Sequence, residues 1–170
     1  MNRMMRGSLI VFSLLIIGLI VSITGTISAK ATKTEVTGQA SLTQVIDLQF
    51  FNDEAGGLHI RNLVLAGNFS LTGDGINIEG TLIEEIIANL DETLSGPAHA
   101  SFTVTMTIDG EETVIWEGHA SGQAVGLSTS GKAVAQGSGP FAGMKLKFSF
   151  EETSFLIYSL EGHILDPHGN

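Results

Sequence analysis

The chain has 170 residues, of which 43% are hydrophobic and 15% are charged, with 21 Gly and no Cys. The length predicts one domain, the high hydrophobic content excludes an intrinsically disordered chain, and the lack of Cys excludes disulfides, thiolate zinc sites and a cysteine nucleophile. Lys and Arg number 8 against 18 Asp and Glu, giving a formal net charge of −10, so nucleic acid is not expected as a partner.

Residues 1–31 have the pattern of a targeting segment. Arg3 and Arg6 come first, and residues 8–29, which include a strongly apolar stretch, carry no charge. This layout is typical of a secretory signal peptide, and Ala29-Lys30-Ala31 fits a cleavage site. The alternative is an uncleaved membrane anchor, because the uncharged run is long enough to cross a bilayer. Both interpretations predict a secreted or extracytoplasmic protein, either free or tethered.

The rest of the chain is predicted to be one domain over 32–165, followed by a C-terminal tail over 166–170. Alternating apolar and polar residues predict antiparallel strands with one solvated face. The clearest alternation is found over 62–72, 76–82, 101–108, 113–120, 144–151 and 156–164. Asp109-Gly110 is a signal for a two-residue hairpin, and Val114 is expected on the same apolar face as Trp116. Residues 82–90 also fit helical spacing, but the neighbouring strands favour a strand.

Five glycines lie inside predicted strands, at the alternate positions that otherwise carry apolar residues, which we call the apolar phase: Gly38, Gly67, Gly80, Gly118 and Gly162. Gly within a strand usually marks a bend or a close approach of another backbone. Five of them indicate a sheet that coils tightly around its own core. We therefore predict an all-β fold, a single antiparallel, closed or nearly closed barrel of about eight strands. The alternative is that these glycines are turn residues between shorter strands.

The stretch Gly137-Ser138-Gly139-Pro140-Phe141-Ala142-Gly143 resembles the Gly-Ser-Gly-x-Phe-x-Gly turn of the allene oxide cyclase-like barrels, an architecture that dirigent proteins share. The similarity covers residues 131–165: a strand into the turn, a strand out of it and a final hairpin. It implies an allene oxide cyclase-like barrel in which Gly137 and Gly139 permit positive φ and Phe141 folds back over the barrel end. In the plant cyclases the first strand ends in Glu-x-Asn. Here Asn52 matches, and Phe50 stands at the Glu position.

The apolar phase supplies the candidate ligand-binding residues of the barrel lumen: Phe69, Phe102, Met106, Trp116, Gly118, Phe148, Phe150 and Tyr158. Aromatic and Met side chains around a lumen can bind a small apolar molecule, or they can form a packed core without a cavity. Gly118 is expected to leave space beside Trp116. The phenol of Tyr158 needs a hydrogen-bond partner, which a ligand can supply. No cofactor is expected.

Glu-Gly-His occurs twice, at Glu117–His119 and at Glu161–His163. Residues at i and i+2 of a strand point to one side, so two such strands lying together could bind a divalent metal. Both pairs are in the polar phase, however, and the expectation is that they are solvated and bind no metal. His59, His99 and His168 are placed in turn-like or terminal contexts, and no catalytic residue is assigned.

Three classes of function remain open. We expect an exported, non-catalytic binding or structural module whose apolar interior can hold a small hydrophobic molecule. The first alternative is an isomerase or cyclase acting on an apolar substrate in the lumen, which needs an inward polar group such as Tyr158 or Asn52. The second alternative is a dirigent-like interaction protein that forms a homo-oligomer.

Overall fold

The computed structural model describes residues 30–126 and 128–169. They form eight strands and one short 3-10 helix: β1 (Thr32–Asn52), β2 (Leu58–Gly73), β3 (Ile76–Leu90), β4 (Gly96–Ile108), β5 (Glu111–Val125), β6 (Ser128–Gly137), η1 (Gly139–Phe141), β7 (Lys145–Ser154) and β8 (Ile157–Asp166). The predicted targeting segment lies outside the described residues, except for Lys30 and Ala31. Within the described residues, no helix has the length and apolar character needed to cross a membrane.

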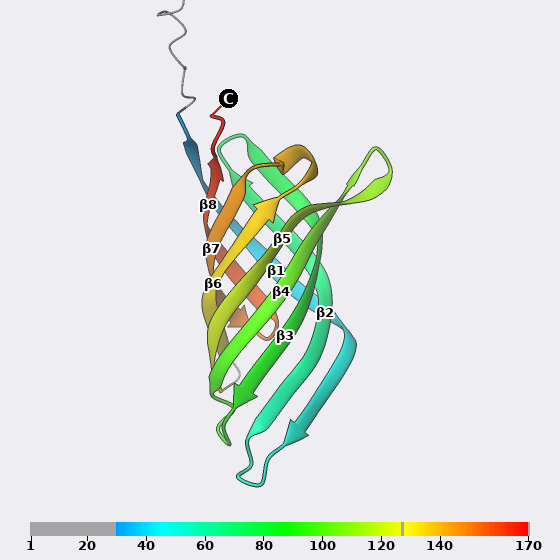
Figure 1. Ribbon diagram of the computed structural model, residues 1–170, viewed down its shortest axis with the longest axis vertical. Helices are drawn as coiled ribbons and strands as arrows, with labels where there is room; N and C mark the ends of the chain where they lie inside the picture. Colours follow the sequence, from blue (N-terminus) through cyan, green and yellow to red (C-terminus); the bar gives the residue numbers. More distant parts are fainter. Residues whose placement is uncertain (1–29, 127, 170) are drawn as a thin grey trace, which may run out of the picture. The chain divides into compact units, whose positions relative to one another are not determined.

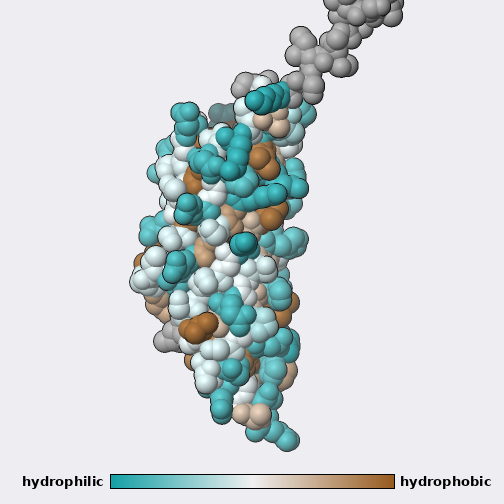
Figure 2. Space-filling view, turned by 90° about the vertical axis from the view of Figure 1, so that its left-hand side faces the viewer, coloured by the Kyte–Doolittle hydropathy of each residue, from teal (hydrophilic) through white to brown (hydrophobic). Residues whose placement is uncertain are grey.

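Each strand pairs antiparallel with the next, and β8 pairs with β1 to close the barrel (Figure 1). The predicted all-β, closed, eight-stranded fold is therefore confirmed. Residues 82–90 belong to β3, as the neighbouring strands suggested. Asp109 and Gly110 form the tight turn between β4 and β5 with φ of 52° and 86°, the positive values that a hairpin turn of two residues favours. Figure 2 shows one face of the molecule, where hydrophilic and neutral residues dominate and hydrophobic ones are scattered.

The barrel is filled by packed side chains at the end that carries η1. Phe141, on η1, folds over this end, and its ring centroid lies 5.1 Å from that of Trp116, as expected from the turn motif. The largest fully buried side chains at this end are Trp116, Leu71, Ile78, Ile115, Leu146, Val36 and Val104, whereas Leu65, which is also fully buried, lies nearer the opposite end. Both the indole and the aliphatic side chains around it are withdrawn from water, which is the main favourable term in folding.

A β-bulge changes the expected alternation in β5. The register between β4 and β5 passes from Val104 opposite Trp116 to Thr105 opposite Val114, which leaves Ile115 as an extra residue. Ile115 and Trp116 are both fully buried, whereas Val114 is exposed. The expectation that Val114 shares the apolar face of Trp116 is therefore wrong, because one inserted residue shifts every residue beyond it to the other face.

The five inward glycines lie within strands, so the alternative that they are turn residues is wrong. A Cβ added at any of them would lie 1.9 to 2.4 Å from a carbonyl oxygen of a neighbouring strand. These positions thus allow the close backbone approach that the sequence indicated. In the turn before β7, Gly139 and Gly143 have φ of 55° and 85°. Gly137 does not take positive φ, which corrects the prediction: it is needed because a Cβ there would lie 2.1 Å from the carbonyl oxygen of Phe141.

β1 continues beyond its pairing with β8. That pairing ends at Ser41 opposite Ile157, whereas the pairing with β2 runs on to Asn52 opposite Leu58. The strands β1 and β2 therefore project past the rest of the barrel at the lower end of Figure 1. Residues 43–52, which we call the β1 edge, have one side without a strand partner among the described residues.

Candidate ligand cavity

The end of the barrel opposite η1 contains a half-open cavity of about 210 Å³, which residues from all eight strands line. This space exists because small side chains line this end of the barrel, whereas large side chains fill the end that carries η1. The small lining residues of β3, β4 and β5 are Ala88, Ala98, Ala100, Ala120, Gly122 and Ala124. The cavity extends to the turn between β7 and β8, where Phe155 and Leu156 border it.

The cavity suits a small molecule. An engineered apolar cavity of about 150 Å³ is known to hold benzene, and drug-sized ligands occupy pockets of about 300 Å³ or more. At 210 Å³ the present cavity lies between the two, so a ligand with one ring and a short substituent, or roughly ten non-hydrogen atoms, is the size that fits.

Five of the eight residues predicted to line the lumen border this cavity: Phe69, Phe102, Phe148, Phe150 and Tyr158. Phe102 meets Phe148 edge-on, with ring centroids 5.9 Å apart. Phe150 meets Tyr158 in the same way at 6.0 Å. These edge-to-face pairs are a favourable aromatic geometry, and they give the cavity an aromatic wall along β7 and β8.

The other three predicted residues, Met106, Trp116 and Gly118, do not line the cavity. Trp116 is fully buried in the packed end. The space expected beside it is absent, because a Cβ on Gly118 would lie 2.4 Å from the Val134 carbonyl oxygen and 2.7 Å from the Ala135 Cβ. Gly118 brings β5 and β6 together and leaves no room for a ligand.

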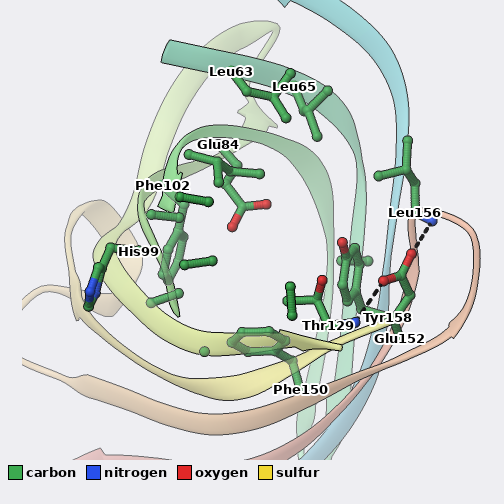
Figure 3. Close-up of a pocket in the computed structure, with 18 of the residues that line it drawn as sticks. Leu63, Leu65, Glu84, His99, Phe102, Thr129, Phe150, Glu152, Leu156 and Tyr158 are labelled. Carbon is green, nitrogen blue, oxygen red and sulfur yellow. Dashed lines mark hydrogen bonds between the residues drawn. The ribbon is translucent and has the colours of Figure 1, made fainter. Parts of the chain in front are cut away.

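The lumen contains one carboxyl group that no other described side chain is positioned to satisfy. Glu84 follows the inward phase of β3, between Leu82 and Ile86, and Figure 3 shows its carboxyl reaching into the cavity. Burial raises the pKa of this carboxyl to about 7, with no hydrogen bond or ion pair opposing that rise. A carboxyl group with such a pKa exchanges its proton near neutral pH.

A second acid, Glu152, lies at the cavity rim and already has partners. Its two carboxylate oxygens accept hydrogen bonds from the backbone N–H of Thr129 at 2.9 Å and of Leu156 at 2.8 Å, as the dashed lines in Figure 3 show. It therefore joins the start of β6 to the turn between β7 and β8. Burial, and then the negative charges of Glu152 and Glu84, raise the pKa of the Tyr158 phenol above its ordinary value.

The cavity has one group suited to proton transfer. The isomerase or cyclase alternative needs an inward polar group, and Glu84 is one; a carboxyl group whose pKa lies near 7 also suits general acid–base catalysis. Tyr158, the first inward polar group expected, is also in the wall. Asn52 is not, since it lies exposed at the end of β1.

Neither acid of the cavity is among the residues predicted from the sequence to line the lumen. Glu84 was hidden because Ile83 and Ile87, which face outward and are 40% and 45% exposed, made residues 82–90 fit helical spacing as well. Strict alternation along β3 places Glu84 on its inward face, where it is the one acid. Glu152 continues the inward phase of Phe148 and Phe150 in the same way.

The repeated Glu-Gly-His motifs lie on strands that are not neighbours. β5, which carries Glu117 and His119, is separated by β6 and β7 from β8, which carries Glu161 and His163. The four side chains therefore do not meet. In the part of the chain that the structure describes, no cluster of three or more acidic or histidine side chains could hold a metal ion.

Two of the three remaining histidines lie in strands, and their expected turn-like placement is wrong. His99 lies in β4 and borders the cavity, but its ring points away from it (Figure 3). His59 lies in β2, with its ring nitrogens 2.9 Å from Asn89 Oδ1 and from Asp53 Oδ2. These two contacts raise the pKa of His59, and the His59 contact lowers the pKa of Asp53. The Asp53–His59 pair therefore stabilises the turn between β1 and β2.

Comparisons with protein-family models and with curated proteins found no match for this chain. The resemblance to allene oxide cyclase-like and dirigent barrels therefore stays a prediction, based on the turn over 137–143.

Proposed function

We propose that this chain is an exported β-barrel that binds one small, largely apolar molecule in its cavity. The observation that carries the proposal is the half-open cavity of about 210 Å³ with six aromatic side chains in its wall. The positively charged start and the uncharged run over 8–29 support export.

A ligand would supply contacts that the barrel lacks. Protein interiors are packed about as densely as organic crystals, and side chains that line an empty space lose attractive contacts with neighbouring atoms. An apolar molecule of matching size restores those contacts and releases water from its own surface. The packed end needs no such filling, because Trp116 and Phe141 occupy it.

The test uses p-cymene, an aromatic hydrocarbon of ten carbon atoms, and isothermal calorimetry on the full-length protein. Ala120→Leu places a larger side chain in the cavity wall, whereas Ala142→Leu makes the same change at an exposed position beside η1. The expected result is saturable binding by the wild type and by Ala142→Leu, and loss of binding in Ala120→Leu. Equal binding by both variants contradicts the proposal, and so does a wild type that binds neither p-cymene nor the corresponding alcohol, 4-isopropylbenzyl alcohol.

A specific observation favours a second candidate, self-association through the β1 edge. Its side chains Val45, Leu48 and Phe50 are 58%, 47% and 56% exposed. They lie opposite Leu65, Leu63 and Ile60 of β2, three residues that line the cavity. The apolar wall of the lumen thus continues onto an open sheet whose outer backbone groups have no strand partner among residues 30–126 and 128–169.

The occupant proposed for this edge is a second copy of the chain, paired antiparallel about a two-fold axis. Natural edge strands are usually protected by Lys or Pro, and residues 43–52 contain neither. A pairing centred on Gln49 puts Leu48 of one copy opposite Phe50 of the other and keeps the two Asp47 carboxylates apart, so apolar pairs form without like charges facing each other.

Sedimentation velocity over a range of protein concentrations tests this second candidate. The wild type is expected to dimerise, Leu48→Lys to remain monomeric, and Val125→Lys, at an exposed position on β5, to dimerise like the wild type. A wild type that is monomeric at every concentration removes the candidate.

A further inference from the structure

The polar groups of the cavity restrict the chemistry of the ligand. The acidic lining residues are Glu84 and Glu152, and neither Lys nor Arg occurs among the described residues that line the cavity. Glu152 is already bound to two backbone N–H groups. Of the two acids, Glu84 is therefore the one left for a ligand to contact, and it lies deeper in the barrel, between Leu82 and Ile86 of β3.

An anionic ligand does not fit this arrangement. A carboxylate or phosphate placed in an apolar cavity needs a positive partner or several hydrogen-bond donors to offset its desolvation. Here it would instead face two carboxyl groups. The negative potential is evident at Tyr158, where Glu152 and Glu84 both disfavour a second negative charge. Ionised fatty acids and other anionic lipids are therefore not expected as ligands.

A pure hydrocarbon fits the shape but leaves Glu84 unsatisfied. Removing a carboxyl group from water without a hydrogen-bond partner costs free energy. Carboxyl oxygens accept hydrogen bonds whether the group is protonated or ionised, so the partner that suits Glu84 in both states is a donor. An O–H donates to it as a neutral group, and an ammonium N–H donates with the added attraction of opposite charge.

We infer that the cavity selects an apolar molecule bearing one hydrogen-bond-donating group, an alcohol or an amine, which is directed at the Glu84 carboxyl. The aromatic wall of Phe102, Phe148 and Phe150 holds the apolar body, and Tyr158 lies in the same wall on the side of β8. This inference rests on the proposed function, since it names the ligand class of the same cavity.

The experiment compares four probes that share one body and differ in one group. They are p-cymene, 4-isopropylbenzyl alcohol, 4-isopropylbenzylamine and 4-isopropylbenzoate, which present a methyl, a hydroxyl, an ammonium and a carboxylate group. Their affinities for the full-length protein are measured by calorimetry at a pH above the Glu84 pKa of about 7. Glu84→Leu and Glu85→Leu form a matched pair of variants, since Glu85 is exposed on the outer face of β3.

For the wild type and Glu85→Leu, we expect the alcohol and the amine to bind roughly tenfold or more tightly than p-cymene, because a hydrogen bond to a charged group is worth about 1.5–3 kcal/mol. The benzoate is expected not to bind. In Glu84→Leu the preference for the alcohol and the amine should disappear while p-cymene still binds. The relative affinities of the alcohol and the amine then show which donor the cavity prefers.

Failure of this inference is distinct from failure of the proposed function. If p-cymene binds the wild type as tightly as the alcohol and the amine, or if the benzoate binds best, the ligand class is wrong and the cavity is still a binding site. If Glu84→Leu keeps the preference, Glu84 is not the group that is contacted. If none of the four probes binds, the proposed function itself is contradicted.

Discussion

The substitution Glu84→Gln tests whether a carboxyl group in the cavity opposes folding when it ionises. Gln keeps the size of Glu and its hydrogen-bonding character but cannot ionise. Burial raises the pKa of Glu84 from 4.5 to about 7 in the folded protein. Because the folded protein holds this proton more tightly than the unfolded chain, wild-type stability falls as pH rises from 4.5 to about 7 and is then constant with respect to this group.

The size of the effect follows from that shift in pKa. Each unit corresponds to about 1.36 kcal/mol, so full ionisation of Glu84 costs up to about 3 kcal/mol of folding free energy. Water that enters the cavity lowers this cost. We therefore expect Glu84→Gln to gain about 1–3 kcal/mol over the wild type between pH 4 and pH 8.

Urea unfolding of both proteins at several pH values measures this difference, and all other titrating groups cancel in the comparison. The side-chain ¹³C shift of Glu84, followed with pH, reports its titration directly and should have a midpoint near 7. A midpoint near 4.5, with parallel stability curves for the two proteins, would falsify the placement of this carboxyl in an apolar cavity.

Gly67→Ala should destabilise the barrel by about 2 kcal/mol or more in urea unfolding, because the added Cβ would lie 1.9 Å from the Ser41 carbonyl oxygen; unchanged stability would contradict the close approach of the strands. Phe141→Ala should cost about 2–3 kcal/mol and shift Trp116 emission to the red, since it uncovers the indole; unaltered emission would show that Phe141 does not close this end. The Asp53–His59 pair stabilises its turn while Asp53 is ionised and His59 is protonated, so amide protection there should decrease as pH falls through the lowered pKa of Asp53 or rises through the raised pKa of His59. Protection that does not change with pH would contradict this account of the turn.

The sequence predicts the barrel because its strands obey a simple rule over most of their length. Residues alternate between lumen and solvent, and glycine recurs where one backbone must pass close to another. The rule fails at Val114, because the bulge at Ile115 depends on how β4 and β5 pair. A pairing between strands is a tertiary property, and no pattern within β5 alone indicates it.

The cavity was only partly predictable for a related reason. Alternation identifies which aromatic residues face inward, and it correctly includes Phe102 and Phe150. It does not say how far along the barrel axis each one lies, so Trp116 was placed beside a ligand although it closes the opposite end. The height of a residue in a barrel depends on strand register and tilt. Glu84 was missed because the exposed residues Ile83 and Ile87 give residues 82–90 an apolar spacing that also fits a helix.

Binding in the cavity is tested most directly by an NMR titration of the full-length, methyl-labelled protein with p-cymene. Leu63 and Ile86 line the cavity, whereas Ile78 and Ile115 are fully buried and do not line it. The proposal predicts saturable shifts of the Leu63 and Ile86 methyl signals and much smaller shifts of the other two. Shifts that do not saturate, or that are equal at all four residues, contradict a binding site in the cavity.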